Sequence, residues 1–196
     1  VVHPSLPAKS VKDLIALARS RPGEINFGAP GAGTLPHLSA ELLNSLSGTK
    51  MVHIPYKGAG AAVTDLLAGR VPVYFMNILQ ALSLIKAGKL RALGVTTPER
   101  SAVAPDIPAI AEEGLAGFDM TNWYGLLVPA ATPRAVIVKL HQETARILNL
   151  PDLRDRLVQD GMTVVASTPE QFGEFLTREM AKYARGIETA GIKGTL

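Results

Sequence analysis

The sequence predicts an α/β protein built on a parallel sheet. Short apolar runs at residues 25–29, 51–56 and 71–75 are each followed by a loop and then by a segment whose apolar residues recur at helical spacing. Strand–helix units with such short connections form parallel sheets through right-handed crossovers. After residue 130 the patterns are mostly helical, which indicates a second part with few strands.

Local signals support each element of the first part. Ser10 is placed to cap a helix that continues to about Arg19, and the strand at 25–29 enters a glycine-rich loop followed by a helix ending at Gly48. Beyond it we expect a strand at 51–56, a helix at 61–68, a strand at 71–75, a helix at 78–87, a strand at 90–95 and a short helix at 107–113.

The second part begins with an extended segment, residues 118–128, that we interpret as a strand crossing between two lobes. We expect it to be followed by helices at 132–148 and 151–159, a strand at 162–166 and a helix from 168 to about 190. One or two strands cannot close a sheet alone. We therefore expect this part to complete a lobe whose other half lies upstream of Val1.

Composition excludes several classes of function. Lys and Arg are scattered singly through a chain of 196 residues with a net charge of +3, so nucleic-acid binding is not supported. The longest apolar runs are broken well before the roughly 18 residues of a membrane span. Cysteine is absent, which removes thiol nucleophiles and disulfides and is compatible with either the cytoplasm or a periplasm.

The loop after the first strand is the main candidate site. Gly28, Gly31 and Gly33 leave its backbone N–H groups accessible, and Thr34 and Pro36 open a helix whose N-terminus favours an anion. The glycine spacing fits neither the dinucleotide fingerprint nor a P-loop, so a carboxylate is favoured over a nucleotide. An ordinary tight strand-to-helix turn is the alternative interpretation.

Other candidates follow the neighbouring strands or lie beside the loop. Tyr56 and Lys57 could meet an anion, although a surface lysine is an equal alternative, and Asn77 could hydrogen-bond a ligand or simply cap a helix. His37 could face a ligand or pack. Trp123 could pack in the core or contact a ligand in a cleft.

Catalytic and metal-binding patterns are not found. The sequence has no G-x-S-x-G elbow, no H-E-x-x-H spacing and no clustered Ser, His and Asp set, and we expect no cofactor. An α/β hydrolase-like enzyme acting on an acyl or phosphate substrate stays an alternative, because fold alone does not exclude it. A regulator's effector-sensing domain is a third possibility, without a DNA-binding element to support it.

Four motifs together resemble one family. They are the sequence GAPGAGT at 28–34 with His37, HIPYKG at 53–58, FMN at 75–77 and WYGLLVP at 123–129. The chain resembles the Bug family, the TctC-like substrate-binding proteins of tripartite tricarboxylate transporters. The resemblance covers nearly all of the sequence, from the leading VVHP to the closing AGIK at 190–193.

The resemblance implies a periplasmic binding protein of type II-like fold, with two Rossmann-like lobes joined by crossing hinge strands and the first lobe incomplete. Residues 1–120 would be the second lobe with a leading hinge strand, and residues 121–196 the return hinge strand and the C-terminal half of the first lobe. It implies a periplasmic monomer that captures a small organic carboxylate between the lobes and delivers it to membrane permease subunits.

The resemblance also implies that the loop at 28–34 supplies amides and a hydroxyl to the carboxylate, with His37 behind it. Together with the candidates at the other strand ends and on the crossing segment, the expected ligand-binding residues are Gly28, Ala29, Gly31, Ala32, Gly33, Thr34, His37, Tyr56, Lys57, Asn77 and Trp123. Ala29 stands where many members have Ser, and Leu35 and Pro36 replace small polar residues, so one or two hydrogen bonds are expected to be lost. Met76 stands where amino-acid-binding members tend to have Asp, which argues against an amino-acid ligand.

Overall fold

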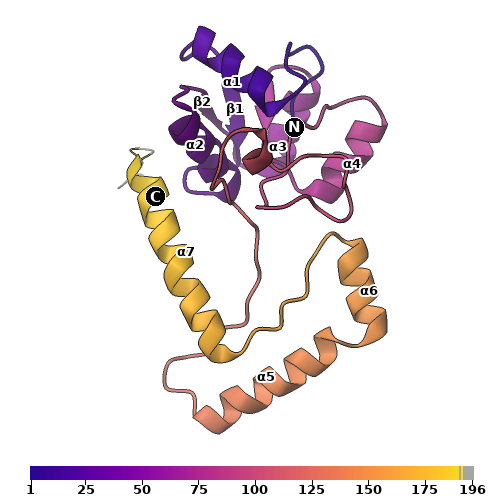
Figure 1. The fold of residues 1–196 in the computed structure, drawn as a ribbon, viewed down its shortest axis with the longest axis vertical. Helices are drawn as coiled ribbons and strands as arrows, with labels where there is room; N and C mark the ends of the chain where they lie inside the picture. The colour runs from indigo at the N-terminus through magenta and orange to yellow at the C-terminus, as the bar shows by residue number, and fades with distance from the viewer. Residues whose placement is uncertain (190, 192–196) are drawn as a thin grey trace. The chain divides into compact units, whose positions relative to one another are not determined.

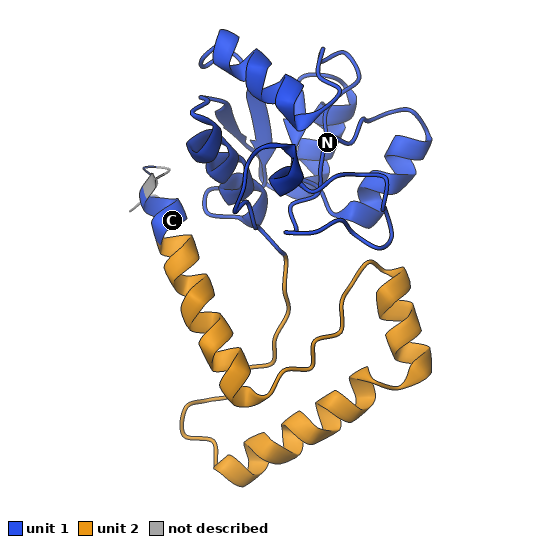
Figure 2. Cartoon of the chain, viewed as in Figure 1, with its two compact units in different colours: residues 1–121, 185–196 blue, residues 122–184 orange. Residues whose placement is uncertain are grey.

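The computed structural model describes residues 1–189 and 191, and the elements follow in the order shown in Figure 1. The chain divides into two compact units (Figure 2). Unit 1 comprises Val1–Thr121 and Arg185–Leu196, and unit 2 comprises Asn122–Ala184. The assignment of residues 1–120 and 121–196 to two lobes stays a prediction.

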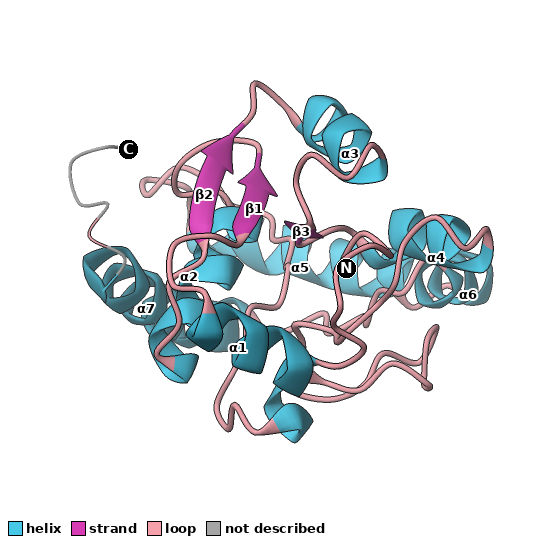
Figure 3. Cartoon of the chain, turned by 90° about the horizontal axis from the view of Figure 1, so that it is seen from above, coloured by secondary structure: helices cyan, strands magenta, loops and turns pink. Residues whose placement is uncertain are grey.

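A parallel sheet forms the centre of unit 1 (Figure 3). Its described strands are β1 (Asn26–Ala29), β2 (Val52–Pro55) and β3 (Val73–Tyr74), in the order β2-β1-β3. Phe27 pairs with His53 on one side and with Val73 on the other. The parallel sheet predicted from the sequence is therefore confirmed, and β1 is its central strand.

Helices connect the strands where the sequence predicts them. Ser10 caps α1 by accepting the Asp13 N–H, and Gly48 ends α2 in the left-handed conformation with φ 65°. Their bounds are Val11–Ser20 for α1, Leu35–Ser47 for α2, Ala59–Leu67 for α3 and Ile78–Lys86 for α4. Helix α2 packs on β1, and α3 contacts both β1 and β3.

Two predictions in unit 1 are wrong. Residues 90–95 form no strand; Arg91 makes a single antiparallel bridge to Val2, and Val95 makes a single parallel bridge to Ala109. Neither bridge continues into a ladder of paired residues. The helix expected at 107–113 is shortened to the 3₁₀-helix η1 (Ile110–Glu113), because Pro108 disfavours helical backbone at the residue before it.

Unit 2 is built from helices. They are α5 (Arg134–Leu148), α6 (Pro151–Gln159) and α7 (Pro169–Thr189), whose last residues fall in unit 1. The expected strands at 118–128 and 162–166 are wrong: both segments are described, and neither pairs with another strand. An apolar run becomes a strand only when a neighbouring strand receives its backbone hydrogen bonds.

The packing of unit 2 centres on Trp123. Its ring meets those of Phe172 and Phe175 edge-on at 5.9 and 5.2 Å, and its Nε1–H donates to Glu179 Oε2 at 3.2 Å. Gly125 lies so close that an added Cβ would be 2.1 Å from Phe172 Cζ. These contacts hold Trp123, near the start of unit 2, against α7.

Much of unit 2 is nevertheless apolar and exposed. No residue of α5 or α6 is fully buried, and Leu126, Leu127 and Val165 are 74%, 70% and 75% exposed. Within the described range, no helix is long and apolar enough to cross a membrane. The last predicted helical residue, Ala190, and residues 192–193 of the closing motif lie outside the described residues.

Candidate ligand-binding loop

The candidate site lies at the carboxyl edge of the sheet. Ala29, at the end of β1, pairs with Pro55 at the end of β2, and the Tyr56 N–H donates to the Ala29 carbonyl at 2.9 Å. Gly28 pairs with Tyr74 at the end of β3. The loops after all three strands therefore leave the sheet at one edge, which is where parallel α/β sheets bind ligands.

The loop from residue 30 to residue 34 has a glycine-dependent conformation. Gly31 and Gly33 have φ of 142° and 73°, and a Cβ added at Gly31 would meet no atom within 4 Å. The Thr34 hydroxyl donates to the Gly31 carbonyl at 2.9 Å and closes the turn. Thr34 occupies the N-cap position of α2, as expected for the residue that opens the helix, but its hydroxyl accepts no hydrogen bond from the first turn.

Peptide N–H groups are left unpaired at this turn. Among the described residues, no hydrogen-bond acceptor meets the N–H groups of Gly31, Ala32, Thr34 and Leu35. They lie at or just before the first turn of α2, where the helix dipole adds partial positive charge. This arrangement can donate several hydrogen bonds to an anion.

The Gly33 N–H behaves differently from its neighbours. It donates to His37 Nδ1 at 3.1 Å. The acceptor nitrogen carries no proton in this arrangement, so the proton of the neutral ring is on Nε2, which lies 3.7 Å from Glu41 Oε1. His37 is 2% exposed and thus lies behind the loop.

Three aromatic rings stack below the loop. The His37 and His53 ring centroids are 4.0 Å apart with 22° between their planes, and His53 is 5.3 Å from Phe27 on its other side. Burial, followed by the charge of His53, lowers the pKa of His37 to about 4. Burial also lowers the pKa of His53, opposed by a hydrogen bond with the Ala29 backbone. Both imidazoles are therefore neutral at pH 7.

The first two loop candidates are packed into the sheet. Gly28 and Ala29 are buried in β1. A Cβ at Gly28 would come within 3.3 Å of side-chain atoms of Tyr56, Tyr74 and Val71. Glycine is needed here for close packing, and the accessible amides begin further along the loop.

The remaining candidates differ in whether their polar side-chain groups already have partners within the protein. The Tyr56 hydroxyl donates to Asp65 Oδ2 at 3.0 Å, and burial together with this carboxylate raises the tyrosine's pKa. Lys57 is exposed and forms no ion pair with the described residues. Asn77 caps α4 by accepting the Leu79 N–H at 3.0 Å. The helix-cap alternative for Asn77 is thus observed, and its ligand role stays a prediction.

Trp123 belongs to unit 2, where its indole N–H is bonded to Glu179. The structure therefore gives it a packing role within that unit. Its role in ligand binding stays a prediction, as does that of Lys57.

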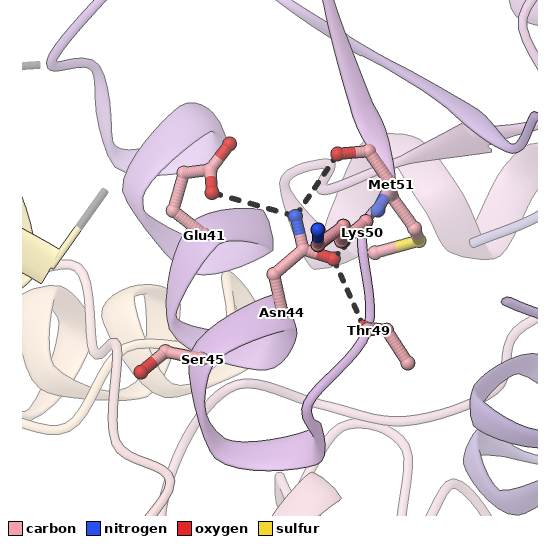
Figure 4. Close-up of a pocket in the computed structure, with 6 residues that line it drawn as sticks. All are labelled: Glu41, Asn44, Ser45, Thr49, Lys50 and Met51. Carbon is pink, nitrogen blue, oxygen red and sulfur yellow. Dashed lines mark hydrogen bonds between the residues drawn. The ribbon is translucent and has the colours of Figure 1, made fainter. Parts of the chain in front are cut away.

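A separate polar hollow of about 260 Å³ lies between α2 and the start of β2 (Figure 4). Asn44 bridges its two sides: Oδ1 accepts from the Met51 N–H and the Thr49 hydroxyl, and Nδ2 donates to the Met51 carbonyl and to Glu41 Oε2. The remaining lining residues are Ser45 and Lys50. Both polar atoms of the Asn44 side-chain amide therefore have two hydrogen-bond partners each, and Asn44 holds α2 to the start of β2.

Sequence reasoning placed His37 behind the loop but missed its contacts with Glu41 and His53. His37 and Glu41 are four residues apart, which is a visible signal because such residues share a helix face. The contact of His37 with His53 depends on the strand register, which the sequence does not show. No group of three metal-ligating side chains is found in the described part of the chain.

The parallel sheet, the glycine loop and the helix N-terminus are features of α/β proteins that bind ligands at the carboxyl edge of the sheet. The model of the family "Tripartite tricarboxylate transporter family receptor" (TctC) matches residues 1–192. The chain belongs to this family, so the resemblance stated from the motifs is confirmed. One of the solved structures described next, BugD, is named a periplasmic binding protein.

Curated and solved relatives agree with this assignment. Protein BugT of Bordetella pertussis is 34% identical over 193 residues, 98% of this chain and 59% of BugT. Among solved structures, R. palustris Rpa4515 with adipate has a TM-score of 0.84 at 33% identity over 97% of this chain. The periplasmic binding protein BugD gives 0.80 at 28% identity over 97%. MatC from Rhodopseudomonas palustris with bound malate gives 0.77 at 28% over 95%.

This chain spans only part of these relatives: 59% of BugT and 64% of each of the three solved chains. The fold is that of periplasmic binding proteins with one lobe incomplete.

Proposed function

We propose that this protein binds a small organic carboxylate at the loop of residues 30–35 and delivers it, in the periplasm, to the permease subunits of a tripartite transporter. The observation that carries the proposal is the group of unpaired N–H donors at Gly31, Ala32, Thr34 and Leu35. Family membership and relatives solved with adipate and malate support the same ligand class.

Binding at this loop would not need a cationic side chain. Hydrogen bonds from peptide N–H groups to an ionised oxygen are shorter and stronger than neutral ones, and the N-terminus of α2 adds favourable electrostatic energy. Since the donors are part of a turn closed by the Thr34–Gly31 hydrogen bond, little ordering is required when the ligand arrives.

Unit 2 would contribute to the other lobe of the binding protein. The exposed side chains of Leu126, Leu127 and Val165 support this proposal, because further chain packed on the unit would remove them from water. Closure of two lobes on the ligand would then complete the site.

Calorimetric titration of the full-length protein tests the proposed function. We expect saturable binding of adipate or malate with one site per chain, and no binding of dimethyl adipate, in which esterification removes both charges. No heat with either acid, or equal affinity for acid and ester, would contradict a carboxylate-binding role.

The Thr34–Gly31 hydrogen bond provides a local test of the same site. Thr34→Val removes the hydroxyl that closes the turn, so we expect carboxylate affinity to fall about 5-fold, or ~1 kcal/mol. Thr34→Ser keeps a hydroxyl in the same position and should bind like the wild type. If Thr34→Val bound the carboxylate as tightly as the wild type, the hydrogen bond that closes the turn would not determine the positions of the N–H donors.

A further inference from the structure

His37 contacts the loop through one atom and the sheet through its ring. Its Nδ1 accepts the Gly33 N–H, while its ring stacks on His53 of β2 at 4.0 Å. The first contact needs an acceptor lone pair at this position, and the second needs only a flat ring. These two functions of one side chain are separable by substitution.

The Gly33 N–H bond determines how the loop backbone is oriented. Because the peptide unit is planar, fixing this N–H also fixes the plane that joins Ala32 to Gly33. Gly33 has φ of 73°, a region in which glycine moves freely between alternatives unless it is held. The Thr34 hydroxyl holds the same turn from the Gly31 carbonyl.

We propose that His37 is a positioning residue: its neutral imidazole holds the Gly33 N–H and thereby sets the neighbouring N–H donors for the ligand, whereas a protonated imidazole releases them. This inference rests on the proposed function and deepens it. His37 is 2% exposed, and we assign it no contact with the ligand.

The groups that face His37 decide its charge. His53 of β2 and Glu41 of α2 are the titratable side chains in contact with it, and Phe27 of β1 brings no charge. Glu41 is itself partly buried, and burial raises its pKa. Burial, followed by His53, disfavours the protonated His37 ring and lowers the pKa of His37 to about 4.

The sign of the pH effect follows directly. An unfolded histidine titrates near 6.5 and the folded one near 4, so between these values the unfolded state binds more protons. The stability contributed by neutral His37 is complete above pH 6.5 and is lost as the pH falls towards 4. In the folded protein His37 stays neutral until the pH approaches 4, so we expect the loop to keep its N–H donors in place down to about that pH.

The experiment compares two variants of the full-length protein. His37→Phe keeps a flat, buried ring but has no acceptor, and His37→Asn places Oδ1 where Nδ1 was but cannot stack. We expect adipate affinity to fall about 5- to 10-fold in His37→Phe and to be largely kept in His37→Asn. We expect thermal stability to change in the opposite order, with His37→Asn the less stable.

A role in packing alone would make affinity follow stability, with His37→Asn the weaker binder, and that result would overturn the proposal.

NMR of the ligand-free wild type gives an independent readout. We expect the His37 ring and the Gly33 amide to titrate with one midpoint near pH 4. A Gly33 amide that does not follow His37 would also overturn it. Failure of both adipate and malate to bind the wild type would contradict the proposed function alone, and the NMR result would still decide the role of His37.

Discussion

Ala32→Asp is expected to weaken carboxylate binding by about 100-fold, or ~2.7 kcal/mol. Ala32 is exposed, has an unpaired N–H and lies between Gly31 and Gly33 in the candidate loop. A carboxylate introduced there would repel the ligand's charge and could itself accept the free N–H groups. Like charges placed together at a binding site typically cost several kcal/mol.

Ala32→Asn is the matched control for this prediction. It has the shape of aspartate without the charge, so it should bind within a few-fold of the wild type, and neither variant should change the melting temperature because residue 32 is exposed. Titration calorimetry measures the affinities. Equal affinities of the Asp and Asn variants would mean that the ligand binds away from this loop.

Phe27→Ala should have the largest effect on stability, lowering the free energy of unfolding by about 3–5 kcal/mol. Phe27 is fully buried in the central strand, and its ring contacts His53 at 5.3 Å between centroids and His37 at 6.0 Å. Removing it would leave a cavity beneath the imidazoles that support the loop. Urea unfolding monitored by circular dichroism measures the change.

Phe27→Leu separates volume from ring stacking. It refills most of the cavity, so we expect a loss of about 1–2 kcal/mol. If Phe27→Ala and Phe27→Leu were equally destabilising, the stack rather than the filled volume would determine the stability of this region. A loss below 1 kcal/mol for the alanine variant would contradict the placement of Phe27 in the core.

The sequence was most informative where local signals and long-range pairing agree. Ser10 and Gly48 mark helix ends by their own chemistry, and the helices they bound form as expected. Residues 90–95 and 162–166 have strand-like composition but form no strand. The missing information is the partner: β-structure depends on which backbone lies alongside, and composition does not encode this.

The candidate site was likewise predictable in outline. The glycines and the helix start predict accessible amides, but not which of them are used inside the protein. Gly28 packs against Tyr56, and the Gly33 N–H is taken by His37, while Ala32 and Thr34 remain available. Which amides stay free depends on His37, four residues after Gly33, and on the side chain of Tyr56, which follows the neighbouring strand β2.

The central claim is that backbone N–H groups of the loop bind the ligand's carboxylate. Its most direct test is an NMR titration of the ¹⁵N-labelled full-length protein with adipate, following the amide signals of Gly31, Ala32, Thr34 and Leu35. New hydrogen bonds to a carboxylate should shift several of these amide protons downfield, saturating with the affinity measured by calorimetry. Saturable binding of adipate that leaves all four signals in place would contradict the claim.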